Sequence, residues 1–162
     1  MNAYELVNGL NQLLNLADAI DNAGAGAKAL TRGQYSTRQA CRLELSQFLL
    51  YIANGNGNLT EGEIALVNIV LGEEYTAYQL RQLASAISVP DPSSSMTLMG
   101  FLSGDALLTQ QNGYRTTSSS DALISAFESF GNLIVAFDEN PVSKTRCMNY
   151  IRGMKSYVLK TL

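Results

Sequence analysis

Apolar residues recur at helical spacing along almost the whole chain, and no segment carries a convincing strand pattern. The first run follows the i, i+3, i+4, i+7 spacing of an amphipathic helix and predicts a helix from about Ala3 to Asn22. Its apolar members are Leu6, Val7, Leu10, Leu13, Leu14, Ala17 and Ile20. Because the later runs have the same period, we predict an all-α fold, a single compact bundle of about seven helices.

Glycine and capping residues set the first boundaries between these helices. Residues 23–33 read AGAGAKALTRG, which contains too many glycines for a stable helix and predicts a mobile connection. A second helix begins near Ser36 and Thr37 and stops at the Asn-Gly run after residue 53. The 162 residues contain no obvious linker, so we expect one domain over 1–162. Within it, 1–36 forms the first helix with its connection, and 37–162 forms the main body.

Caps and prolines divide the rest of the chain. Thr60 and Glu63 have the Ser/Thr-x-x-Glu spacing of a capping box and predict the start of a third helix. Residues 89–95, VPDPSSS, end the fourth helix because proline cannot continue the hydrogen-bond ladder. The remaining helices are expected to start at Thr76, after the serines of 93–95, within 118–121 and after Pro141.

An internal repeat would make the fold two pseudo-repeated helix-loop-helix units. Residues 48–56 (FLLYIANGN) align with 132–140 (NLIVAFDEN), each an apolar helix end followed by a polar turn. Two ordinary helix ends explain the match equally well. If the repeat holds, Glu44 and Glu128 can approach each other and share a proton or hold a cation, whereas solvated or salt-bridged carboxylates are the simpler expectation.

The loop after residue 53 is a candidate site for a divalent cation because several of its side chains carry oxygen. The candidate ligands are Asn56, Asn58, Glu61 and Glu63. An EF-hand counted from Asn54 would need glycine at its sixth position and glutamate at its twelfth, where this chain has Leu59 and Ala65. The EF-hand pattern is therefore excluded. A capped turn is a sufficient alternative, since Asn and Gly tolerate left-handed backbone and a capping box follows.

The segment FLLYIANGNGNLTEGEIALVNIVLGE, preceded by TRQACRLELSQ, resembles the tellurite-resistance TerB-like domain. The similarity is strongest from about Thr37 to Ile87. In that family the loop carries Asp-Gly, then a hydrophobic residue, Ser/Thr and Glu. The matching positions here are Asn56-Gly57, Leu59, Thr60 and Glu63.

The resemblance implies a compact all-α bacterial domain linked to stress response, membrane-proximal complexes and metal ions, without an established catalytic role. Asn56 stands where the family has Asp, and Asp138 has Thr145 seven positions later in place of Glu. Both departures argue against tight binding of a metal. We therefore expect no cofactor other than this candidate divalent cation.

Residue types argue against an enzyme. The chain has no histidine, which removes the commonest general base, the usual catalytic triads and most zinc sites. Cys41 and Cys147 both fall in helical patterns and are expected to be buried, unpaired thiols. Isolated carboxylates such as Glu5 and Asp105 are expected on solvated helix faces or as helix caps.

Charge and hydropathy argue against binding to nucleic acid and against insertion into a membrane. Only 15% of residues are charged and the net charge is −3, so no basic surface for nucleic acid is expected. The chain lacks the roughly 18 consecutive apolar residues of a membrane span. Its start, MNAYELVNGLNQLL, also lacks the layout of a signal peptide. We expect a cytoplasmic protein without membrane insertion.

Three functions fit these features. The first is a non-enzymatic protein-interaction module that uses an exposed helix face or the glycine-rich segment, with tyrosines as anchors. Candidate anchors are Tyr4, Tyr35, Tyr114, Tyr150 and Tyr157, and most of them fit equally well as amphipathic residues at the edge of the core. The second is a divalent-cation sensor built on the loop. The third is an immunity or chaperone-like partner of a secreted toxin. Glycines within helices indicate close helix packing or contact between copies in a homo-oligomer, or they are tolerated at a cost of roughly 1 kcal/mol each. They are Gly9, Gly100, Gly104, Gly131 and Gly153.

Overall fold

The helical periodicity of the sequence becomes eight α-helices in the computed structural model, which describes residues 3–54, 58–86, 88–138 and 140–161. No strand occurs in these ranges, so the prediction of an all-α fold is confirmed. In chain order the elements are α1 (Ala3–Asn22), α2 (Gly26–Leu30), α3 (Thr37–Ala53), α4 (Glu61–Leu71), α5 (Ala77–Ala86), the 3₁₀ helix η2 (Pro92–Ser94), α6 (Met96–Asn112), α7 (Ser118–Asp138) and α8 (Pro141–Thr161).

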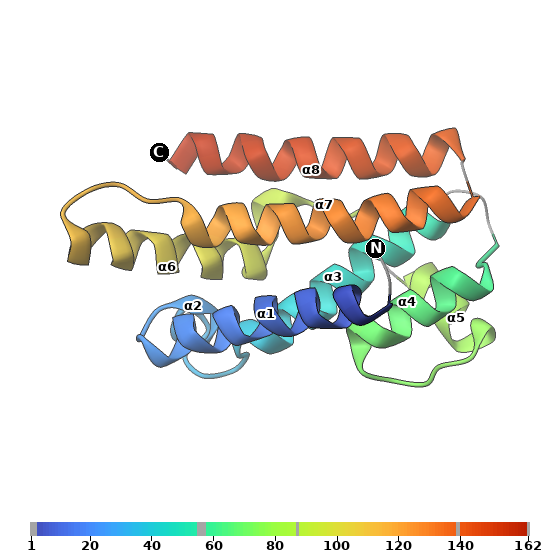
Figure 1. The fold of residues 1–162 in the computed structure, drawn as a ribbon, viewed down its shortest axis with the longest axis horizontal. Helices are drawn as coiled ribbons and strands as arrows, with labels where there is room; N and C mark the ends of the chain where they lie inside the picture. The colour runs from blue at the N-terminus through green and yellow to red at the C-terminus, as the bar shows by residue number, and fades with distance from the viewer. Residues whose placement is uncertain (1–2, 55–57, 87, 139, 162) are drawn as a thin grey trace.

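Helix α3 is the central element of the bundle. It contacts α1, α4, α5, α6, α7 and α8, and its Leu45, Phe48 and Ile52 are fully buried. Helices α7 and α8 form an antiparallel pair along one edge, and α1 runs on the other side of α7 (Figure 1). One cluster of buried apolar side chains contains residues of α1, α3, α4, α5, α6, α7 and α8.

The predicted helix starts are confirmed at three capping residues. Ser36 and Thr60 each form a capping box, with Gln39 and Glu63 respectively, at the starts of α3 and α4. Ser95 caps α6 by accepting a hydrogen bond from the Leu98 amide. These boundaries are local, because each cap joins residues three positions apart.

The expectation of a mobile connection over residues 23–33 is wrong, because this segment contains the short helix α2. Its first amides bind side chains from other helices: the Gly26 amide donates to Ser103 Oγ and the Ala27 amide to Thr37 Oγ1, both at 2.8 Å. Asp21 at the end of α1 accepts from the Thr37 amide at 2.8 Å and from its hydroxyl at 2.7 Å. These contacts between helices stabilise α2 despite the glycines.

Close packing between α2 and α6 explains one of the helical glycines. A Cβ atom on Gly100 would lie 2.9 Å from the backbone nitrogen of Ala27, which is closer than real Cβ contacts allow. By contrast, a Cβ atom on Gly9 in α1 would meet nothing within 4 Å. Glycine is therefore required by packing at Gly100 but not at Gly9.

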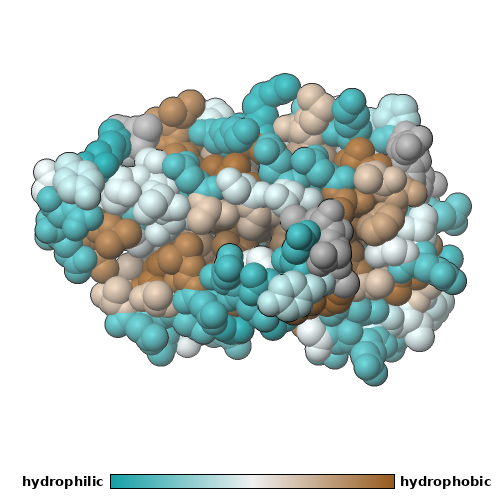
Figure 2. All heavy atoms as spheres, viewed as in Figure 1, coloured by the Kyte–Doolittle hydropathy of each residue, from teal (hydrophilic) through white to brown (hydrophobic). Residues whose placement is uncertain are grey.

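The surface is mixed in character. On the face shown in Figure 2, apolar residues form separate patches divided by polar ones. None of the helices in the described ranges combines the length and the apolar character that crossing a membrane requires.

Candidate functional site

The candidate cation-binding loop leads into α4, whose start is held by a capping box. Thr60 Oγ1 accepts a hydrogen bond from the Glu63 amide at 3.2 Å, and Glu63 Oε1 accepts one from the Thr60 amide at 2.8 Å. Glu63 is buried, whereas Asn58 and Glu61 are exposed. Asn56 lies outside the described residues. The prediction that Thr60 and Glu63 cap this helix is confirmed.

A metal site in this loop stays a prediction. In the ranges that the structure describes, no three His, Cys, Asp or Glu side chains are grouped so that they could hold a metal ion. One oxygen of Glu63 already accepts the Thr60 amide, so a cation would compete with the helix cap for that carboxylate. The other described candidate ligands, Asn58 and Glu61, lie at the surface.

Glu44 of α3 caps the start of α6. Its Oε1 accepts a hydrogen bond from the Met96 amide at 2.8 Å. Its Oε2 accepts from the Thr97 amide and from the Ser95 hydroxyl, each at 2.8 Å. The first amides of a helix have no partner within the helix, and a negative charge is favoured beside them. Glu44 therefore fixes α6 against α3.

Two other carboxylates singled out in the sequence have separate roles. Glu128 does not share the partners of Glu44; its Oε2 lies 3.5 Å from Nζ of Lys155, and its side chain is 47% exposed. Asp105 of α6 is buried and accepts hydrogen bonds from the Ser119 and Ser120 amides at the start of α7, at 2.8 and 3.0 Å. The expectation that such carboxylates act as ion-pair partners or helix caps is confirmed for both.

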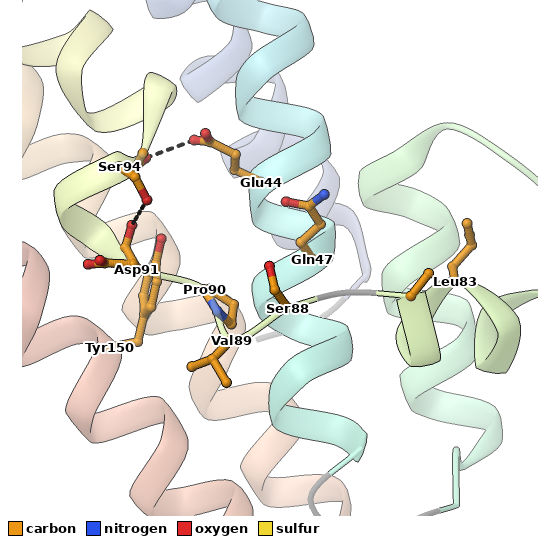
Figure 3. Close-up of a pocket in the computed structure, with 11 residues that line it drawn as sticks. Glu44, Gln47, Leu83, Ser88, Val89, Pro90, Asp91, Ser94 and Tyr150 are labelled. Atoms are coloured by element: carbon orange, nitrogen blue, oxygen red, sulfur yellow. Dashed lines mark hydrogen bonds between the residues drawn. The ribbon is translucent and has the colours of Figure 1, made fainter.

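An open pocket of about 380 Å³ lies beside Glu44 (Figure 3). We call it the Glu44 pocket. Its lining residues, from α3, α5, the segment between α5 and α6, and α8, are Glu44, Gln47, Leu83, Ala86, Ser88, Val89, Pro90, Asp91, Ser94, Ser95 and Tyr150. Apolar walls with a few convergent polar groups are typical of binding sites. The pocket is therefore the candidate functional site.

Tyr150 lines the pocket from α8 and is held by aromatic packing. Its ring centroid lies 4.7 Å from that of Phe48 and 6.1 Å from that of Phe127. Only 6% of the residue is exposed. Burial raises the pKa of Tyr150 well above its usual range, and the negative charge of Glu44 raises it further. The hydroxyl therefore keeps its proton at neutral pH.

Both cysteines are free, buried thiols, as the sequence predicts. Burial raises the pKa of Cys41 to about 12, and the charge of Glu44 adds to the effect. Burial likewise raises the pKa of Cys147 to about 11, with a contribution from Glu128. Because the thiolate is the reactive form of cysteine, neither residue is suited to nucleophilic chemistry near neutral pH.

The pocket itself is not apparent from the sequence. In the sequence, Glu44 stands out as a carboxylate within an apolar helix. Residues 89–95, VPDPSSS, stand out as the segment before α6. Neither pattern indicates that the two meet, or that Asp91 and Tyr150 line the same recess. The sequence predicts Tyr150 either as an anchor for a partner or as an amphipathic residue at the edge of the core; in the structure it is 6% exposed and lines the pocket.

Comparison of the chain with protein-family models, with curated proteins and with solved structures finds no match. The resemblance to TerB-like domains therefore stays a prediction, and function is inferred from the Glu44 pocket and the surface around it.

Proposed function

We propose that this protein is a non-enzymatic protein-interaction module and that a partner protein docks over the Glu44 pocket. The rim of the pocket carries the proposal. Val89 is 71% exposed and Leu83 is 42% exposed, beside a polar recess that contains Glu44 and Asp91. Apolar side chains left in solvent around such a recess are typical of surfaces that another protein covers.

Several side chains of the pocket are already held in place by the fold. Glu44 is held by three hydrogen bonds to the start of α6, and the ring of Tyr150 is packed against Phe48. Asp91 caps η2 by accepting a hydrogen bond from the Ser93 amide at 3.0 Å. A partner would therefore lose little free energy in ordering these side chains when it binds.

The same groups favour binding over catalysis. General acid–base catalysis works best with a group whose pKa lies near the working pH. Tyr150 has a raised pKa, and Glu44 is engaged by hydrogen bonds that hold the fold. The TerB-like resemblance supplies the setting of the proposal, a bacterial cytoplasmic protein of the stress response.

Capture of the partner through the pocket rim tests this proposal. A photo-crosslinking residue at Val89 is expected to trap a defined protein in cells of the source organism, and the same residue at Val142 on α8 serves as the control. Val142 is also exposed but does not line the pocket. The trapped protein should then bind the purified wild type and lose binding to Leu83→Asp.

The matched control for this substitution is Leu159→Asp, because Leu159 is 68% exposed and lies outside the pocket. Equal binding by the two variants would contradict docking over the Glu44 pocket. If the trapped protein is a secreted toxin, the immunity-partner function is selected; if it belongs to a stress-response complex, the TerB-like setting is supported.

A further inference from the structure

The Glu44 pocket keeps several hydrogen-bond acceptors that the fold does not use. A carboxylate offers about four acceptor positions. Glu44 uses three of them on Ser95, Met96 and Thr97. Asp91 uses Oδ1 for the Ser93 amide, and its Oδ2 accepts no hydrogen bond from the described part of the chain. Both carboxylates therefore keep the capacity to accept hydrogen bonds from a ligand.

The Tyr150 oxygen adds a third acceptor. Its hydroxyl lies beside Ser95, whose single hydroxyl proton is already donated to Glu44. Ser95 therefore has no second proton to donate to the Tyr150 oxygen. This leaves the lone pairs of the Tyr150 oxygen without a donor among the described residues, at a side chain that is only 6% exposed.

The charged side chains that line the pocket are all negative. Its lining contains two carboxylates, Glu44 and Asp91, and neither lysine nor arginine. Both carboxylates act on Tyr150, since their charges help burial to raise the pKa of its hydroxyl. An anionic ligand would be repelled, whereas a cation that donates hydrogen bonds would meet complementary charge and complementary acceptors.

The walls of the pocket suit a cation on an apolar stem. Leu83, Val89 and Pro90 supply apolar surface beside the polar groups, and the recess of about 380 Å³ is open to solvent. Arginine and lysine combine an apolar stem with a charged head. A bare metal ion is a poorer match, because most acceptor positions of Glu44 are used within the fold.

We infer that the Glu44 pocket binds the guanidinium or ammonium group of an arginine or lysine side chain that the docked partner protein presents. This inference rests on the proposed docking function and adds the chemistry of recognition. The charged head contacts Asp91, the remaining lone pair of Glu44 and the Tyr150 oxygen, while the stem lies against Val89 and Leu83. Arginine is favoured over lysine, because a planar guanidinium can bind a carboxylate through two parallel hydrogen bonds.

A titration with a minimal probe tests the chemistry without the partner. The ¹⁵N-labelled full chain is titrated with N-acetyl-arginine-methylamide at about physiological salt, and with the citrulline analogue as a neutral control of nearly the same shape. Saturable amide shifts grouped at Val89, Asp91 and Ser95 are expected for the arginine compound alone. Equal shifts from both compounds, or no grouped shifts, would overturn the inference.

Asp91→Asn is the informative variant. Asparagine caps a helix as well as aspartate does, so η2 is expected to remain intact while one charge is lost. Affinity for the arginine compound should fall about tenfold, the effect expected when a charge-assisted hydrogen bond is weakened. Asp121→Asn is the matched control, because Asp121 is an exposed aspartate at the start of α7 outside the pocket. Equal losses in the two variants would contradict the assignment.

The two proposals fail in different ways. If Leu83→Asp abolishes partner binding but the arginine compound does not bind, docking stands and recognition of a basic side chain is wrong. If the arginine compound binds at Asp91 but no partner depends on Leu83, the pocket is a site for a free cationic molecule and docking is wrong. Replacement of single basic residues in the trapped partner then identifies the side chain, and binding that survives each of these replacements also refutes the inference.

Discussion

Glu44 Oε2 accepts a hydrogen bond at 2.8 Å from the backbone amide of Thr97, which lies 53 positions later in the chain. The carboxylate of one helix thus supplies the cap for another helix. Asp105 does the same for α7, and Asp21 for α3. Only 15% of the residues in the chain are charged. Three of its carboxylates, all buried or partly buried, each join their own helix to the start of another helix.

Glu44→Gln is expected to lower the free energy of unfolding by about 2 kcal/mol. The amide group that replaces one carboxylate oxygen faces donors at the start of α6 and cannot accept their hydrogen bonds. Urea unfolding followed by circular dichroism measures the loss. Glu128→Gln is the matched control, because its solvated pair with Lys155 should contribute less than about 1 kcal/mol. Similar losses of unfolding free energy in both variants would show that the Glu44 cap stabilises the fold no more than a solvated ion pair does.

Gly100→Ala should destabilise the protein by about 1 to 3 kcal/mol, because the added Cβ collides with the backbone of α2. Gly9→Ala offers a contrast at an open helical position, where alanine should be neutral or should stabilise by up to about 1 kcal/mol. The two melting temperatures should shift in opposite directions or by clearly different amounts. A stable Gly100→Ala variant would mean that α2 does not pack against α6.

The Asp18–Arg38 pair predicts a small dependence of stability on pH. Hydrogen bonding to Arg38 lowers the pKa of Asp18 below its usual value of 3.8. Because the folded-state pKa is the lower one, the stabilisation is present above pH 3.8 and is lost as pH falls through the folded-state value. Asp18→Asn should therefore cost at most about 1 kcal/mol at pH 7, since the pair is solvated.

The difference between wild type and Asp18→Asn should shrink as the pH is lowered to about 2.5, provided both proteins are still folded. Asp121→Asn, at an aspartate without an ion pair among the described residues, controls for the general effect of removing a carboxylate. A difference from wild type that stays constant over this pH range would contradict the role of the pair.

The loop before α4 is tested with divalent cations. We expect no rise in melting temperature when millimolar Ca²⁺, Mg²⁺ or Mn²⁺ is added to chelator-treated wild type, since Glu63 is engaged in the helix cap. Asn56→Asp restores the residue usual in the TerB-like family, and stabilisation of this variant alone would indicate a metal site lost in the present chain. Stabilisation of the wild type would instead support the sensor function, with Asn56, Asn58, Glu61 and Glu63 as ligands.

Local signals in the sequence were sufficient for most helices. Helical period, proline and capping residues act between positions a few residues apart, so the all-α class and the caps at Ser36, Thr60 and Ser95 could be predicted. Helix α2 could not, because glycine content argues against a helix and its stabilising contacts come from Ser103 and Thr37.

By itself, the sequence determined the kind of element that each segment forms, because those preferences arise within one or two helical turns. Only the tertiary structure decided which side chains meet. Glu44 and Ser95 are brought together across 51 positions by the packing of α3 against α6, and Tyr150 joins them from α8. Hydrophobic burial is not directional, so no local motif specifies which helices pack together. The packing of the helices then determines which polar side chains line the Glu44 pocket.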